Sequence, residues 1–206
     1  MSALPLEPCP TVDLIFPING RFLPRDHAQA LKDALCRAWP WLEAEPLAGV
    51  QSIKLVPGLE PQAMLSGRAK LLLRLSRERA AELVKGTAMD LQVAGQALHL
   101  GVPHVRELVP HTTMYAYHVA AVEADTDETT FMAGVTQALS VLGVGGERVC
   151  GKRQQLALAS GRVTTFSLML HGLAPAPSLH LQQHGIGPHR LLGCGIFIPH
   201  KSAAAV

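Results

Sequence analysis

The chain has 206 residues, of which 48% are hydrophobic and 17% are charged, and its formal net charge is +2. This composition excludes a disordered chain and is sufficient for one or two domains with a real core. No stretch has the roughly 20 apolar residues of a membrane helix, and the first twenty residues lack the features of a secretory signal. Four single cysteines without a C-x-x-C pair indicate a reduced, cytoplasmic protein without a zinc site.

The charges are unevenly distributed along the chain. Up to Glu147 there are 12 basic and 16 acidic side chains, whereas from Arg148 onward there are six basic side chains and no acidic one. Five of the ten histidines also lie in this C-terminal part. Such a charge balance is typical of a surface that binds a polyanion, although a Gly- and Pro-rich segment poor in all charges could produce the same count.

The first half of the chain predicts alternating strand and helix patterns. Apolar residues at every second position predict a strand at 12–18, and apolar residues at helical spacing predict a helix with Asp26 as its N-cap. The predicted elements of this half are a strand at 12–18, a helix between Pro24 and Pro40, strands at 50–56 and 69–76, a helix at 77–86 and a bent or hairpinned strand at 89–101. The order β-α-β-β-α-β is that of a ferredoxin-like unit.

The second half repeats this pattern without a close sequence repeat. Its predicted elements are a strand at 112–122, a helix at 128–143, two strands within 147–173, a short helix at 176–185 and a last strand at 190–198. A stretch with two prolines, from Val102 to Pro110, connects the halves. We therefore predict an α+β fold with antiparallel sheets, made of two tandem ferredoxin-like domains at 1–105 and 106–206 and ending in a glycine-rich loop.

The densest run of unusual residues is GIGPHRLLGCGIFIPHK, residues 185–201. Glycines allow backbone N–H groups to approach phosphate oxygens closely, and basic side chains add charge-assisted contacts. The candidate RNA-binding residues of this segment are Gly185, Gly187, His189, Arg190, Gly193, Gly195 and Lys201. A tight helix-to-strand connection is the alternative explanation of the glycines.

The pattern G-I-G-x5-G-C-G-x3-P-x-K, on the last predicted helix-to-strand connection, resembles the glycine-rich loop of the Cas-six family of CRISPR repeat-processing endoribonucleases. The stretch from Val12 to Leu42 is similar to the opening strand and helix of that family. The resemblance implies metal-independent cleavage of precursor CRISPR RNA within its repeats, through attack by the ribose 2′-hydroxyl and without a cofactor. Its partners would be a hairpin-forming repeat RNA and other subunits of a CRISPR effector complex. A catalytically inactive RNA-binding subunit is the alternative.

Metal-free RNA cleavage needs a proton acceptor, a proton donor and a cation near the phosphate. The resemblance makes His27 the acid/base candidate, and the dipole of the helix that begins there favours the neutral imidazole that a base requires. A capping or core-edge histidine is the alternative. The family often has a tyrosine and a lysine as well. Here no tyrosine precedes His27, and the lysine candidates are Lys32 and Lys54, each of which could also be a surface lysine.

Basic residues also flank the hairpin that is predicted in the second half. Arg148, Lys152, Arg153 and Arg162 are candidate phosphate contacts to a folded RNA stem, although each could be ordinary surface charge. No metal site is expected, because H-L-Q-Q-H at residues 180–184 lacks the glutamate of H-E-x-x-H.

Overall fold

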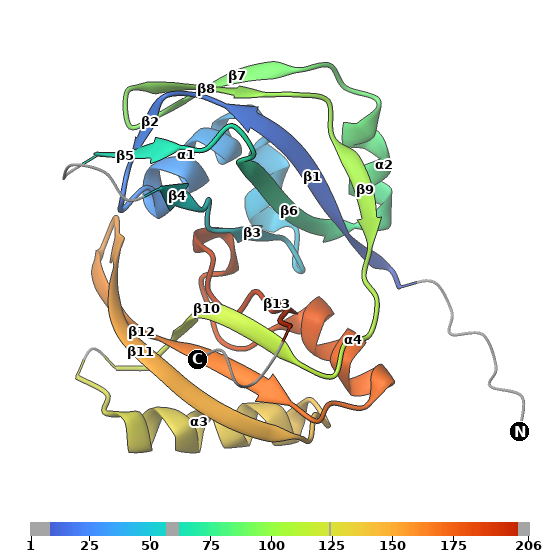
Figure 1. The fold of residues 1–206 in the computed structure, drawn as a ribbon, viewed down its shortest axis with the longest axis vertical. Coiled ribbons are helices and arrows are strands. Elements are labelled where there is room, and N and C mark those ends of the chain that lie inside the picture. Colours follow the sequence, from blue (N-terminus) through green and yellow to red (C-terminus); the bar gives the residue numbers. More distant parts are fainter. Residues whose placement is uncertain (1–8, 57–61, 124, 202–206) are drawn as a thin grey trace, which may run out of the picture.

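The computed structural model describes residues 9–56, 62–123 and 125–201. They form two halves, each with an antiparallel sheet and helices packed on it (Figure 1). The N-terminal half, drawn from blue to green, lies above the C-terminal half, drawn from yellow-green to red. The predicted mixture of helices and antiparallel sheets is confirmed.

The main sheet of the N-terminal half has the order β3-β6-β1-β8-β7, and β9 pairs with β1. Its strands are β1 (Thr11–Asn19), β3 (Gly49–Gln51), β6 (Lys70–Ser76), β7 (Met89–Val93), β8 (Gln96–Leu100) and β9 (His104–Glu107). Alternate residues of β1 and β6 face the core beneath α1 (Ala28–Ala38) and α2 (Arg77–Val84). The hairpin predicted at 89–101 is confirmed as β7 and β8. The β9 strand lies in the stretch that was predicted to connect the halves, so the first sheet extends to Glu107.

The strand predicted at 50–56 is wrong as a single element. Its ends belong to different sheets, because β3 pairs with β6 whereas β4 (Leu55–Val56) pairs with β5 (Gln62–Leu65). With β2 (Phe22–Pro24), these two strands form a small sheet in the order β2-β5-β4. The sequence did not predict β2 or β5. The break in the strand turns the residues between β3 and β4 toward the C-terminal half.

The sheet of the C-terminal half has the order β11-β12-β10-β13. Its elements are β10 (Met114–Ala120), α3 (Glu128–Val141), β11 (Glu147–Leu158), β12 (Gly161–His171), α4 (Pro175–His184) and β13 (Ile198–Pro199). The strand predicted at 190–198 is wrong over most of its length. A short 3₁₀ helix, η2 (Arg190–Leu192), replaces its start, Cys194 forms an isolated parallel bridge with His118 of β10, and Ile198 and Pro199 pair with β10 as the strand β13. Another 3₁₀ helix, η1 (Pro40–Ala44), follows α1.

A buried arginine joins the two halves. Arg74 of β6 is 0% exposed, and its guanidinium donates two hydrogen bonds, of 2.8 and 3.2 Å, to the carboxylate of Asp13 on β1. The Nη1 atom of Arg74 donates to the carbonyl oxygens of Gln182 and Phe197 in the C-terminal half, at 2.7 and 3.1 Å. The buried charge is therefore paired, and the same side chain fixes the end of α4 and the last segment of the chain against the first sheet.

Candidate active-site cleft

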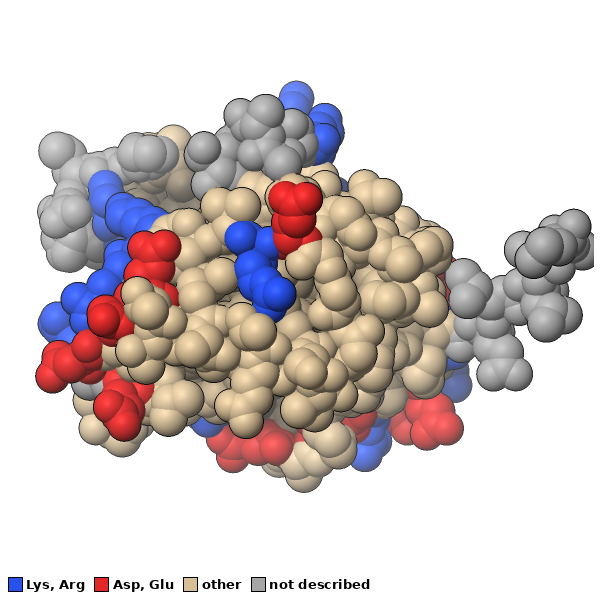
Figure 2. Space-filling model, turned by 90° about the horizontal axis from the view of Figure 1, so that it is seen from below, with Lys and Arg blue, Asp and Glu red and all other residues tan. Residues whose placement is uncertain are grey.

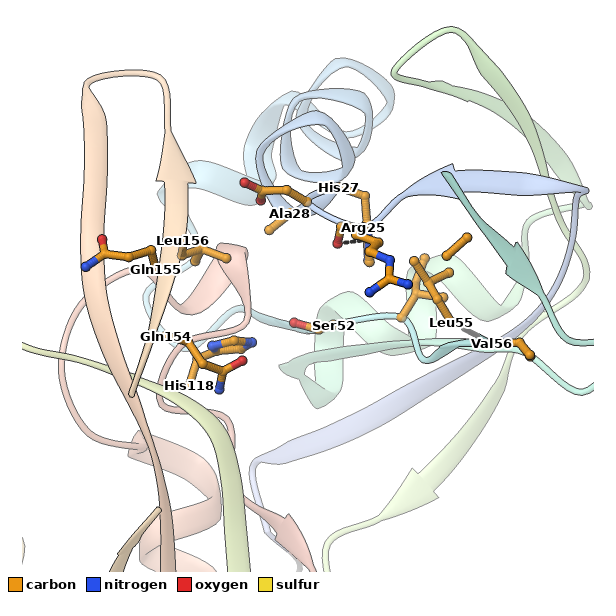
Figure 3. A pocket seen from close by; sticks show the side chains of 13 residues that line it. Arg25, His27, Ala28, Ser52, Leu55, Val56, His118, Gln154, Gln155 and Leu156 are labelled. Carbon is orange, nitrogen blue, oxygen red and sulfur yellow. Dashed lines mark hydrogen bonds between the residues drawn. The ribbon is translucent and has the colours of Figure 1, made fainter. Parts of the chain in front are cut away.

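A cleft of about 420 Å³ lies between the two halves. The residues that line it are Arg25, Asp26, His27, Ala28, Ser52, Ile53, Leu55, Val56 and Ala63 from the N-terminal half, and His118, Gln154, Gln155 and Leu156 from the C-terminal half. Figure 3 shows Arg25 and His27 on one side of this space and His118 and Gln154 on the other. The cleft thus combines side chains from segments that are far apart in the sequence, such as His27 and His118.

His27 is the residue at the N-cap of α1, and it is 5% exposed. Asp26, predicted as the cap, lies one residue earlier and is exposed. The Nδ1 atom of His27 lies 3.1 Å from the carbonyl oxygen of Pro24 and 3.2 Å from that of Arg25. Both partners are acceptors, so Nδ1 carries the proton and Nε2 has a lone pair.

The Nε2 atom of His27 is buried and has no hydrogen-bond partner among the described residues. Burial lowers the pKa of His27, although hydrogen bonds to the carbonyls of Pro24 and Arg25 and the charge of Asp26 act in the opposite direction. The imidazole is therefore neutral near pH 7. A buried acceptor without a partner costs free energy, which is typical of a group retained for chemistry.

His118 lies on β10 and was not predicted as a site residue. Its Nδ1 atom is 3.0 Å from Oγ1 of Thr165 on β12. Burial lowers the pKa of His118, and the charge of Asp26 across the cleft opposes that shift. Asp26 therefore acts electrostatically on both histidines of the cleft.

Neither lysine candidate lies in this cleft. The Nζ atom of Lys32 forms a 2.8 Å ion pair with Glu43, and that hydrogen bond raises the pKa of the lysine. Lys54 is exposed and lies 5.3 Å from the ring centroid of Tyr117, beside a neighbouring groove. The basic side chain that does line the cleft is Arg25, whose guanidinium points into it (Figure 3).

The glycine-rich segment packs inside the protein instead of forming an open loop. The backbone N–H groups of Gly185, Gly193 and Gly195 donate to the carbonyl oxygens of Leu181, Arg190 and His118, respectively, at 2.8, 3.1 and 2.7 Å. All three glycines are buried. Their N–H groups are thus occupied within the protein, and phosphate contacts at these positions stay a prediction that would require these hydrogen bonds to be exchanged.

Glycine is required in this segment by close packing. Gly185 and Gly195 have φ angles of 63° and 67°, and a Cβ on either would collide with the backbone of the other strand of the loop. The exposed residues of the segment are Gly187, Pro188 and His189 at its turn and Pro199 and Lys201 near its end. Of the predicted RNA-binding residues in this segment, Gly187, His189 and Lys201 therefore remain at the surface.

Arg190 is a structural residue in this fold. Its guanidinium donates to the carbonyl oxygens of Leu47, Ala48, Gln183 and His184, two from each half. Burial, followed by repulsion from Arg74, lowers the pKa of Arg190 to about 10, which still leaves it charged near pH 7. Its donors already bind backbone oxygens, so a contact between Arg190 and an RNA phosphate stays a prediction that would require some of these hydrogen bonds to be exchanged.

The basic residues of the second half are on exposed parts of the β11–β12 hairpin. Arg148 donates to Oγ1 of Thr136 on α3, at 3.1 Å, and lies away from the cleft. Lys152, Arg153 and Arg162 are exposed as predicted for a surface that could contact RNA. Figure 2 shows the molecule from below, where uncharged residues cover most of this face and Lys and Arg at its left edge lie among Asp and Glu.

Within the described ranges, no group of three or more His, Cys, Asp or Glu side chains is placed to hold a metal ion. No described helix has the length and apolar character needed to cross a membrane.

Comparison with known proteins identifies the family. The family model described as Cas6 Crispr matches residues 12–202 of the chain. The CRISPR-associated endonuclease Cas6 of Myxococcus xanthus (strain DK1622) is 36% identical over 195 residues, which cover 95% of this chain and 84% of that protein. The chain therefore belongs to the Cas6 family, as its sequence pattern had indicated.

Solved structures show the same fold. A CRISPR-associated protein Cas6 superposes with a TM-score of 0.64 at 8% identity, covering 93% of this chain and 100% of the other. A Cas6-related protein from Pyrococcus furiosus gives a TM-score of 0.62 at 11% identity, with 91% and 98% covered. Thermus thermophilus Cse3, bound to an RNA representing a pre-cleavage complex, gives 0.52 at 17% identity, with 91% and 98% covered.

Proposed function

We propose that this protein is an endoribonuclease that cuts precursor CRISPR RNA within its repeats, without a metal ion. In this reaction the ribose 2′-hydroxyl attacks the adjacent phosphorus, and the products carry a 2′,3′-cyclic phosphate and a 5′-hydroxyl. The cleft supplies the groups that the chemistry needs. The observation that carries the proposal is the buried lone pair of His27 Nε2, which has no partner in the described protein.

His27 would act as the general base. Its Nδ1–H is held by two backbone carbonyls, so the tautomer with an accepting Nε2 is fixed before RNA binds. Its lowered pKa keeps this acceptor unprotonated near pH 7. Because Nε2 is covered in the RNA-free protein, RNA binding would have to uncover it through a local movement of the cleft wall.

Arg25 would stabilise the charge that develops on the phosphate. It precedes His27 by two residues, lines the same cleft and directs its guanidinium into it (Figure 3). A cation at this place binds the pentavalent phosphorane more strongly than the starting diester, which is what lowers the barrier. We assign this role to Arg25 in place of Lys32 and Lys54.

The RNA would lie across both halves. A related fold, that of Thermus thermophilus Cse3, is known bound to RNA, and the curated relative is named an endonuclease. Exposed cations on β11 and β12, including Lys152, Arg153 and Arg162, would contact the phosphates of a hairpin stem. In each half, the first and third strands of the ferredoxin-like pattern are central in the sheet: β1 and β6 in the N-terminal half, and β10 and β12 in the C-terminal half. This common order supports two ferredoxin-like halves that together hold the substrate.

The test is to incubate the protein with the repeat RNA from its own genome in the presence of EDTA. We expect cleavage at one position, a 2′,3′-cyclic phosphate end, and no cleavage of a repeat with 2′-deoxyribose at the scissile nucleotide. A strict requirement for Mg²⁺, or cleavage of the 2′-deoxy substrate, would overturn the proposed chemistry. Tight repeat binding with no cleavage under any condition would instead identify a catalytically inactive RNA-binding subunit.

A further inference from the structure

Strand β10 contains an irregularity at the point where it passes the cleft. In its pairing with β12, Ala116 lies opposite Leu168 and Val119 lies opposite Phe166. Tyr117 and His118 therefore share the single position opposite Ser167, which is the arrangement of a β-bulge.

This bulge changes the face on which His118 lies. Met114 and Ala116 point into the core of the C-terminal half, and so do Val119 and Ala121. In a regular strand, every second residue faces the same side, so His118 would point into that core with Met114 and Ala116. The extra residue shifts the alternation by one, and His118 instead lines the cleft opposite His27.

The surrounding structure fixes His118 at this point. Its ring is oriented by the contact between Nδ1 and Oγ1 of Thr165, and its carbonyl oxygen accepts the hydrogen bond from Gly195. Within the described part of the chain no hydrogen bond involves Nε2 of His118. Unlike Nε2 of His27, this atom is not fully buried, and His118 lines the cleft.

We propose that His118 is a second catalytic residue, the general acid that protonates the departing 5′-oxygen. This inference rests on the proposed endoribonuclease function, and it adds the proton donor that His27 does not supply. Cleavage without a metal needs a donor on the opposite side of the phosphorus from the base. The two histidines lie on opposite walls of the cleft, one from each half of the protein (Figure 3).

The proton balance closes with these two residues alone. Nε2 of His27 takes the proton from the 2′-hydroxyl, and the 2′-oxygen forms a bond to phosphorus. The bond between phosphorus and the 5′-oxygen breaks, and the imidazolium form of His118 gives its Nε2 proton to that oxygen. Burial lowers the pKa of His118 in the RNA-free protein, so the step requires the negative charges of Asp26 and of the RNA phosphate to favour this protonated form. His27 is then protonated and His118 is neutral, and exchange with water restores both.

The experiment uses the repeat RNA with sulfur in place of the bridging 5′-oxygen at the cleavage site. A thiolate leaves without protonation, so the sulfur substrate does not need a general acid. Single-turnover rates on both substrates, in EDTA, are compared for the parent, His118→Ala, His118→Gln and His27→Ala. His99→Ala, which removes an exposed histidine outside the cleft, is the control. Melting temperature and RNA affinity confirm that each variant is folded and binds.

We expect both His118 variants to cut natural RNA about 10²- to 10⁴-fold more slowly than the parent, and to cut the sulfur substrate at close to the parental rate. His27→Ala should remain slow on both. If the parent cuts and folded His118 variants cut natural RNA equally fast, or are equally slow on both substrates, the inference is overturned while the proposed function stands. Rescue of His27→Ala instead would also overturn it. If the parent cuts neither substrate, the proposed function fails as well.

Discussion

The backbone N–H of Gly195 donates a 2.7 Å hydrogen bond to the carbonyl oxygen of His118. The neighbouring Cys194 forms an isolated parallel bridge with the same residue of β10. The glycine-rich segment thus continues the C-terminal sheet beside the strand that carries the cleft histidine. Its glycines serve the geometry of the cleft, whereas the sequence had suggested that they contact phosphates directly.

Gly195→Ala should destabilise the protein and slow cleavage. The position has a φ of 67°, and an added Cβ would meet the carbonyl of Ile186, so the free energy of unfolding should fall by more than about 1 kcal/mol. Gly134→Ala on α3 is the matched control. No atom lies within 4 Å of its added Cβ, and alanine there should raise stability by about 0.5–1 kcal/mol. Chemical denaturation measures both, and equal stability of the two variants would contradict the assigned packing.

Replacing Arg190 should lower the stability of the protein, whereas replacing the exposed basic residues Lys152 and Arg153 of the β11–β12 hairpin should lower its RNA affinity. Arg190→Met removes hydrogen bonds to four backbone carbonyls, so the melting temperature should fall, while the RNA affinity of the folded protein and its salt dependence should persist. Lys152→Ala/Arg153→Ala should leave the melting temperature nearly unchanged and lower affinity, with a weaker dependence on salt because fewer counterions are released. Binding titrations at several salt concentrations measure the affinities. If Arg190→Met lowered RNA affinity and its salt dependence while the melting temperature stayed unchanged, Arg190 would be an RNA contact.

Asp13→Asn should be among the most destabilising single changes. It leaves the buried guanidinium of Arg74 without its carboxylate, and breaking a buried ion pair costs about 3–5 kcal/mol. Glu107→Gln, which weakens the exposed pair with Arg77, should cost less than about 1 kcal/mol. Denaturant unfolding of both variants makes the comparison. A loss of similar size in both would show that the buried pair of Asp13 and Arg74 contributes no more to stability than an exposed pair.

Stability should decrease as the pH falls below about 6.5, the ordinary pKa of histidine. Burial lowers the pKa of His27 in the folded state, so below that pH the unfolded chain binds more protons than the folded one, and unfolding is favoured. The stability that the neutral His27 contributes is lost as the pH falls from the pKa of this histidine in the unfolded chain to its lower pKa in the folded protein. His27→Gln should make the pH dependence of the unfolding free energy shallower between pH 5 and 7, by at most about 1.4 kcal/mol per pH unit. An unchanged slope would show that His27 is not buried in its neutral form.

The periodic features of the chain could be predicted from the sequence, because apolar spacing reports directly which face of a helix or strand is buried. Helices α1, α2, α3 and α4 and the long strands β1, β6, β11 and β12 follow from that spacing. The shift in β10 could not be predicted, since it depends on which residue of β12 lies opposite Tyr117 and His118. Without that pairing, His118 is one histidine among ten.

The same limit applies to the candidate site residues. His27 could be singled out because it lies at a helix start and in a stretch with family resemblance. Arg190 was predicted as an RNA contact because a basic side chain between two G-x-G pairs can add a charge-assisted contact to a phosphate. Only the packing of the two halves brings four carbonyl oxygens around it. Arg25 had no distinguishing sequence signal, because its role depends on a cleft formed by both halves.

The most direct test of the account is the single-turnover rate of His27→Ala on the repeat RNA in EDTA, measured with its melting temperature and RNA affinity. Loss of a general base should slow cleavage by about 10²- to 10⁴-fold, while affinity stays near the parental value because phosphate contacts dominate binding. A folded variant that binds the repeat and still cuts at the parental rate would contradict the account and remove His27 from the active site.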